Sequence, residues 1–278
     1  MKHILQYSGI GILFIFMTAY LSSCRNNESV VDNHIEFDSI QVEKTYHVDN
    51  DSTRPSCNLK INFVYPSDYE DKAILDSLQQ LFVFGLLNDD TYGYYSPKEA
   101  LNKYEKDYVE NYKRDVEIFF DEKLEQEESD KYFSYYETIR NEIKYNQNNI
   151  LSFQVIQTNY KGGTDSYEFY RNYSIDLMTG QRIMENDIFD SGFESELSSM
   201  FKSHLLESNK VKSIPELENL GYFGIDEIIP NGNILLDKNG VTYTFNKGEY
   251  SAYKLDPIHI FIPYKDISFL IKEDSPVI

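Results

Sequence analysis

The strongest constraint on the fold is an alternation of apolar and polar side chains early in the chain. It runs through the segments IEFDSIQVEKTYHV (35–48) and CNLKINFVY (57–65), which the turn-rich loop DNDSTRPS separates. Alternation with a period of two places every second side chain on the same face of an extended strand. The sequence therefore predicts two β-strands here, with Cys57 as a small, partly buried and unreactive residue of the second.

Two amphipathic helices are predicted after these strands. Ser67-Asp68-Tyr69-Glu70 has the S-x-x-E spacing of a capping box, and Ser96-Pro97-Lys98-Glu99 repeats it with proline at the first helical position. The apolar stripe of the second helix comprises Leu101, Tyr104, Tyr108, Tyr112, Val116, Phe119 and Leu124. Charged residues cover the other faces, so this stripe is expected to face a core and not a cofactor.

Three long strand-like runs follow, at 131–145, 149–160 and 166–180, after the acidic break EQEESD. The connecting segments NQNN and KGGTD carry turn signals. Neighbouring strands of this length predict an antiparallel meander on which the two helices pack.

A smaller unit is predicted from Ile183 onward. The segment 187–208 is amphipathic, 233–246 has the form of a hairpin around Lys238-Asn239-Gly240, and 256–271 supplies a last strand and a short helix. The predicted fold class is therefore α+β. An antiparallel sheet packed by two N-terminal helices (35–182) is followed by a smaller α/β C-terminal unit (183–278).

The N-terminus resembles the leader of a bacterial lipoprotein. A short positive segment precedes an apolar run at 10–21, which is shorter than a membrane span, and Leu21-Ser22-Ser23-Cys24 resembles a lipobox. This resemblance implies a signal peptide at 1–23, lipidation of Cys24, a polar tether at 24–34 and a position in the cell envelope. The alternatives are an uncleaved signal anchor and a secreted protein in which Cys24 has no role.

The charge of the chain restricts its partners. It has 26 Lys and Arg against 46 Asp and Glu, which gives a formal net charge of −20. Nucleic-acid binding depends on cationic side chains that neutralise phosphates, so we expect no nucleic-acid partner. An acidic surface favours cationic partners or serves solubility.

No motif for catalysis or metal binding occurs in the sequence. The histidines His34, His47, His204 and His259 are isolated from one another. His47 and Asp49 would supply two ligands, too few for zinc. The segment 88–99 has part of a calcium-loop spacing, but Tyr92 stands where an oxygen ligand belongs. We therefore predict no catalytic residue, no metal site, no cofactor and no enzymatic activity.

Two segments resemble the PdaC/RsiV-like extracytoplasmic family. NYKGGTDSYEFYRNYSIDLMTGQRIMENDIF (159–189) is similar to its strand–turn–strand signature through Tyr160, Gly162-Gly163, Asp176, Gly180 and Asp187-Ile188-Phe189. VTYTFNKGEYSAYKLDPIHIFIPYKDI (241–267) is similar to its C-terminal signature through Glu249, Tyr253 and Ile262-Pro263-Tyr264. The family continues the Gly-Gly turn with Ala-His, whereas this chain has Thr164-Asp165, so any role of that histidine is absent here.

The resemblance implies a PdaC-like N-terminal domain (35–182) and an RsiV-like C-terminal domain (183–278). In the family this module accompanies a polysaccharide deacetylase or an anti-sigma factor that binds lysozyme. It therefore implies a non-enzymatic binding module whose partner is a cationic lysozyme-type muramidase or cell-wall glycan. The alternative is an envelope glycan hydrolase or a deacetylase accessory protein. Because loops host binding, the candidate contact residues are Gly162, Gly163, Thr164, Asp165, Glu249, Tyr250 and Tyr253.

Overall fold

The computed structural model describes residues 31–117, 131–162 and 166–277. Several predictions concern positions outside these ranges: the leader with Cys24, the stripe residues Phe119 and Leu124, the acidic break, and Gly163, Thr164 and Asp165 of the Gly-Gly turn. None of the helices in the described ranges is both long and apolar enough to cross a membrane.

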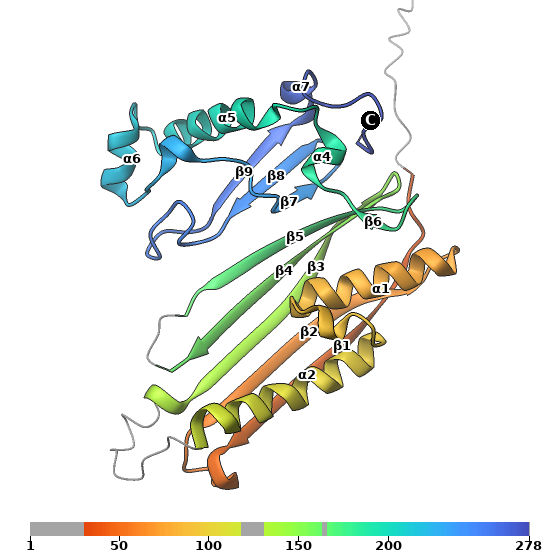
Figure 1. The fold of residues 1–278 in the computed structure, drawn as a ribbon, viewed down its shortest axis with the longest axis vertical. Helices are drawn as coiled ribbons and strands as arrows, with labels where there is room; N and C mark the ends of the chain where they lie inside the picture. Colours follow the sequence, from red (N-terminus) through yellow and green to blue (C-terminus); the bar gives the residue numbers. More distant parts are fainter. Residues whose placement is uncertain (1–30, 118–130, 163–165, 278) are drawn as a thin grey trace, which may run out of the picture. The chain divides into compact units, whose positions relative to one another are not determined.

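Within the described residues, six strands form the large sheet in sequential order. They are β1 (Glu36–His47), β2 (Ser56–Asp68), β3 (Tyr135–Gln147), β4 (Ile150–Lys161), β5 (Glu168–Asp176) and β6 (Gln181–Arg182) (Figure 1). The predicted antiparallel pairing is confirmed for β1–β2 and for the meander β3–β4–β5.

The pairing of β2 with β3 differs from the prediction because it is parallel. Parallel neighbours need a crossover connection, and here the segment with α1 (Lys72–Leu87) and α2 (Pro97–Tyr112) supplies it. The α+β class is confirmed, but the large sheet is mixed and not wholly antiparallel. Short 3-10 turns η1 (Val48–Asn50) and η2 (Asp90–Tyr92) and a π-helical turn η3 (Lys113–Glu117) complete this half.

The start of α1 corrects the first predicted capping box. Strand β2 continues through Asp68, and the helix begins after Asp71, whose carboxylate accepts hydrogen bonds from the amides of Ala73 (2.9 Å) and Ile74 (3.1 Å). For α2 the predicted box is confirmed, since the Glu99 carboxylate accepts from the Ser96 amide at 3.3 Å and Pro97 starts the helix.

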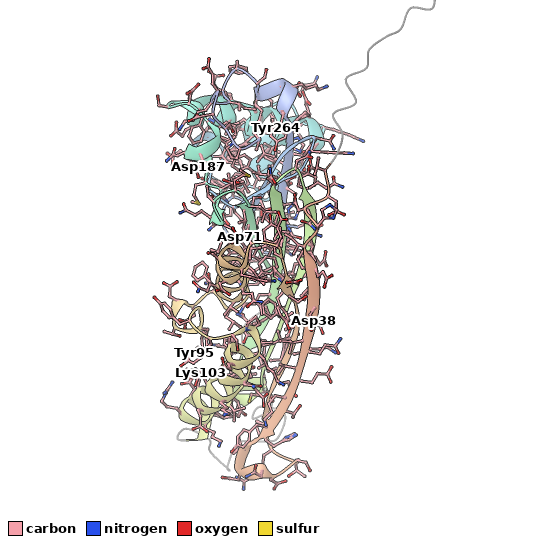
Figure 2. The ribbon with its side chains drawn as sticks, turned by 90° about the vertical axis from the view of Figure 1, so that its right-hand side faces the viewer. Asp38, Asp71, Tyr95, Lys103, Asp187 and Tyr264 are labelled. Atoms are coloured by element: carbon pink, nitrogen blue, oxygen red, sulfur yellow. The ribbon has the colours of Figure 1, made fainter. Side chains whose placement is uncertain are left out.

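Both helices pack on one face of the large sheet, and Figure 2 shows Asp71, the N-cap of α1, and Lys103 of α2 on that side. Phe82 of α1 stacks on Phe153 of β4 with ring centroids 3.9 Å apart. Gly85 permits this approach, because a Cβ there would lie only 3.0 Å from the rings of Phe153 and Tyr173. The core of this half therefore lies between the two helices, α1 and α2, and strands β1–β5.

The C-terminal half adds a small antiparallel sheet, in which the described residues form three strands in the order β7–β8–β9. Its elements are α4 (Glu185–Ile188), α5 (Phe193–Ser208), α6 (Ile214–Leu220), η4 (Ile225–Glu227), β7 (Ile234–Leu236), β8 (Gly240–Phe245), β9 (Ile258–Pro263) and α7 (Tyr264–Ile267). Strands β7 and β8 form the hairpin expected from the sequence. Every fourth residue of α5 from Phe193 to Leu205 is buried, as its amphipathic pattern predicts.

Asparagine side chains from the small sheet cover the free edge of β5. Asn246 Oδ1 accepts from the Tyr170 amide at 2.7 Å and its Nδ2 donates to the Tyr170 carbonyl at 3.0 Å. Asn233 Oδ1 accepts from the Asn172 amide at 2.8 Å. These side-chain amides make the hydrogen bonds that a neighbouring strand would make. The backbone groups on this edge of β5 are therefore not open to pairing with another strand. Residues 31–278 form one compact unit, and the predicted division at 182/183 stays a prediction.

Candidate functional site

The first predicted contact segment, the Gly-Gly turn, is described only as far as Gly162. This residue has φ +57°, and a Cβ there would lie 2.0 Å from the carbonyl oxygen of Tyr132. The close backbone approach excludes a side chain, and the left-handed conformation also favours glycine. The glycine is therefore explained by the local structure.

In the second predicted segment, two of the three residues hold the loop together. Glu249 accepts hydrogen bonds from the Asn246 amide at 2.9 Å and from the Asn231 side-chain amide at 3.0 Å. The ring of Tyr250 packs edge-on against Phe245, with centroids 5.4 Å apart. Tyr253 differs from them, since 55% of its surface is exposed.

The structure brings Tyr253 together with residues that follow the Gly-Gly turn. The ring centroid of Tyr167 lies 4.8 Å from that of Tyr253 and 6.0 Å from that of Phe169, which is 39% exposed. We call Tyr167, Phe169 and Tyr253 the aromatic patch. Two causes raise the pKa of Tyr167: mainly its hydrogen bond with Tyr253, and to a smaller extent its partial burial. Sequence analysis selected Tyr253 but missed Tyr167 and Phe169, which look like ordinary positions of an aromatic strand.

The hydroxyl end of Tyr253 lies against a glycine. Gly248 has φ +89°, and a Cβ at that position would lie 2.7 Å from the hydroxyl oxygen of Tyr253. A larger residue at 248 would therefore be strained by its backbone conformation and would displace the Tyr253 hydroxyl.

A pocket between α2 and the large sheet was not predicted. It has a volume of about 220 Å³, and we call it the tyrosine pocket. The described residues that line it are Tyr92, Tyr104, Asp107, Tyr108, Asn111, Tyr112, Asp115, Tyr135, Glu137, Gln157, Asn159 and Lys161. The predicted core stripe is confirmed for the buried Leu101, Tyr112 and Val116. Tyr104 and Tyr108 pack against the core but are only partly buried. The signal that could have shown the pocket is the use of tyrosine, which carries a polar group, on successive turns of this helix.

Glu137 is the buried acid of the tyrosine pocket, with 7% of its surface exposed. Its carboxylate accepts from the Tyr104 hydroxyl at 2.6 Å and from the Gln157 side-chain amide. The Gln157 carbonyl oxygen accepts in turn from Arg171 Nη1 at 2.6 Å, so the guanidinium is separated from Glu137 by one neutral side chain. Both hydrogen-bond donors that contact this carboxylate are therefore uncharged.

The tyrosine hydroxyls of the pocket remain protonated at neutral pH. Burial, reinforced by the charge of Glu137, raises the pKa of both Tyr104 and Tyr108. Burial and the hydrogen bond to Asp107 raise the pKa of Tyr92. The negative charge of the pocket therefore resides on its carboxylates.

The other sequence candidates for chemistry have structural partners. His47 Nδ1 lies 3.0 Å from the Arg54 carbonyl oxygen, and Asp49 forms an ion pair with the Arg54 side chain. In the calcium-like segment, the Tyr92 hydroxyl donates to Asp107 at 2.8 Å. Burial raises the pKa of the Cys57 thiol to about 11, so it is protonated. Across 31–117, 131–162 and 166–277, no group of three or more His, Cys, Asp or Glu side chains is placed to hold a metal ion.

These features define a mixed α+β protein with an exposed aromatic patch and a small pocket lined by aromatic and acidic side chains. Residues 186–265 match the model of a family described as a protein of unknown function, DUF3298. The match lies within the predicted C-terminal unit and begins in α4. No curated protein matches this chain.

Two solved structures of the DUF3298 family are similar to the described fold. The protein from Bacteroides fragilis NCTC 9343 is 29% identical with a TM-score of 0.82, over 88% of this chain and 96% of that chain. The protein from Pseudomonas aeruginosa PAO1 is 11% identical with a TM-score of 0.62, over 87% of this chain and 97% of that chain. The second likeness shows the fold alone.

Proposed function

We propose that this chain is a PdaC/RsiV-like lipoprotein of the cell envelope that binds a cationic protein such as a lysozyme-type muramidase without catalysing a reaction. The aromatic patch carries this proposal, because it joins Tyr253 of one predicted contact segment with Tyr167 and Phe169, which follow the other segment, at one exposed place. Exposed tyrosines are typical centres of protein interfaces. The net charge of −20 favours a cationic partner and would accelerate the encounter.

The test is a calorimetric titration of the full chain, in nonionic detergent, with hen lysozyme at low and at high salt. We expect binding that weakens with salt, because screening reduces attraction between exposed charges. Tyr253→Ser should weaken it about 10-fold, as expected for an aromatic hot spot. Tyr94→Ser is the matched control, since Tyr94 is 90% exposed and lies outside the patch. Absence of heat with lysozyme at low salt would exclude this partner.

Three further measurements separate the remaining alternatives. Cys24→Ala should release the protein from the membrane fraction, and retention would contradict the lipid anchor. Incubation of the purified chain with cell-wall glycan should leave the glycan unchanged. Hydrolysis or deacetylation would favour the alternative of a glycan hydrolase or deacetylase accessory protein. Binding of soluble glycan fragments in the absence of lysozyme binding would assign the patch to glycan.

A further inference from the structure

We infer that the tyrosine pocket is a binding site for a small organic cation that carries an alkylammonium group. The inference goes beyond the proposed function, because the pocket and the aromatic patch share no residue. It rests on three observations: the aromatic walls of the pocket, the excess of carboxylates over cations in its lining, and ammonium–tyrosine contacts that the chain already makes beside it.

The walls of the pocket are tyrosine rings held at right angles to one another. Tyr112 and Tyr135 meet edge to face, with centroids 5.2 Å apart and an angle of 76°. Tyr92 and Tyr104 meet in the same way at 5.5 Å and 71°. Tyr92 and Tyr112 are almost fully buried, so the rings that can meet a ligand are those of the partly buried Tyr104 and Tyr135. Their neighbours fix both rings in place, and aromatic faces attract alkylammonium groups through cation–π interactions.

The lining of the pocket contains more carboxylates than cations: Asp107, Asp115 and Glu137 against Lys161. Asp107 is paired with Lys103 at 2.8 Å, and Asp115 is exposed. The Arg171 guanidinium attracts the buried Glu137 carboxylate but is separated from it by the neutral Gln157 side chain. A ligand cation would give this buried carboxylate the direct ion pair that it does not make with a described cation.

The chain's own lysines make the expected contact next to the pocket. Lys103 Nζ lies 5.8 Å from the ring centroid of Tyr92, and Lys113 Nζ lies 4.8 Å from that of Tyr46. Tyr46 in turn contacts Tyr112, with centroids 6.2 Å apart. Tyrosines in and beside this pocket therefore already attract ammonium groups at its rim.

The size and lining of the pocket restrict the ligand class. A volume of about 220 Å³ is below the roughly 300–1,000 Å³ of pockets that enclose drug-sized ligands. It accommodates the head group of a cation or a short alkylamine. The carboxylates disfavour an anion by like-charge repulsion.

The test compares choline with its uncharged isostere 3,3-dimethylbutan-1-ol on the full chain in nonionic detergent. Tyrosine fluorescence reports binding directly, because the sequence contains no tryptophan. We expect choline to bind at least about 10-fold more tightly than the isostere, since cation–π attraction requires the charge. Equal affinity, or no saturable response to choline, would overturn the inference without any variant being needed.

Two variants locate the site. Glu137→Gln keeps the shape of the side chain and the acceptor for Tyr104 but removes the charge, and we expect choline binding to weaken at least about 10-fold. Tyr108→Phe keeps the ring and is the matched control, so binding should be retained. Thermal unfolding of each variant verifies that it is folded. Choline affinity unchanged by Glu137→Gln would overturn the assignment of the pocket. Failure to bind lysozyme would not affect any of these results.

Discussion

The phenolic oxygen of Tyr104 on α2 lies 2.6 Å from a carboxylate oxygen of Glu137 on β3. This contact ties the second helix to the large sheet through a group that is almost fully buried. A hydrogen bond to a charged acceptor contributes more than one between neutral groups. Removing the donor also leaves a buried carboxylate with one partner fewer.

Tyr104→Phe should therefore destabilise the protein by about 2 kcal/mol, within the range for hydrogen bonds to charged groups. The measurement is the free energy of unfolding from urea titration. Tyr108→Phe is the control, because its hydroxyl donates to the neutral Asn58 carbonyl at 3.2 Å, and it should cost less than half as much. Equal losses of unfolding free energy for Tyr104→Phe and Tyr108→Phe would show that the hydrogen bond from Tyr104 to Glu137 contributes no more than one to a neutral acceptor.

Gly85→Ala should destabilise the protein although alanine is the better helix former. Helix propensity alone would favour alanine by about 1 kcal/mol. The added Cβ, however, would lie 3.0 Å from the rings of Phe153 and Tyr173, which are stacked with centroids 4.9 Å apart and cannot move independently. Overpacking of this kind costs about 1–3 kcal/mol.

Thermal unfolding checks the sign of this effect. Gly93→Ala is the matched control, because Gly93 has φ −62° and its nearest neighbour would be 3.6 Å from the new Cβ. We expect no loss of stability there. A rise in melting temperature for Gly85→Ala would mean that α1 can shift away from the sheet.

Asp71→Ala should cost about 1 kcal/mol, the usual value of a helix N-cap. Ser67→Ala should leave the unfolding free energy nearly unchanged, because Ser67 lies in β2 and not at the start of the helix. The pair of variants distinguishes the observed cap from the one that the S-x-x-E spacing predicts. A larger loss of unfolding free energy for Ser67→Ala than for Asp71→Ala would support the helix start that the S-x-x-E spacing predicts.

The difference between these two caps shows what local patterns can decide. Alternation located β1 and β2, and long strand-like runs between turn signals located β3 to β5. The spacing of Ser96 and Glu99 located the start of α2. All of these signals depend on near neighbours in the chain. The parallel pairing of β2 with β3 depends on how the crossover packs. The contact of Tyr167 with Tyr253 joins residues far apart in sequence. Neither of these long-range relationships leaves a periodic signal.

The same limit explains why the tyrosine pocket was missed. The stripe on α2 has the periodicity of a buried face, and periodicity does not distinguish a closed core from the wall of a pocket. Glu137 occupies an inward position of β3 beside buried Ile139. An acidic residue on the inward face of β3 is the local sign that apolar packing between α2 and the sheet is interrupted at this position.

Glu185→Gln should stabilise the protein at neutral pH. Burial raises the pKa of Glu185 above its ordinary value of 4.5, so the folded state binds a proton at this site more readily than the unfolded state does. The contribution of this group to stability is therefore complete below pH 4.5 and is lost as the pH rises through the higher folded-state pKa. Glutamine is uncharged at every pH, and its side-chain oxygen can still accept from the Gly232 amide, which lies 3.2 Å from Glu185 Oε1.

Glu185→Gln should raise the free energy of unfolding at pH 7, and this gain should disappear as the pH falls below 4.5. Asp107→Asn is the matched control, because the pH dependence of its contribution to stability has the opposite sign. The hydrogen bond from Lys103 lowers the pKa of Asp107, so its contribution is present above its unfolded-state pKa and lost in acid. Unfolding free energies between pH 3 and pH 8 should therefore change in opposite directions for the two variants. Parallel pH profiles would show that burial does not penalise the charge on Glu185.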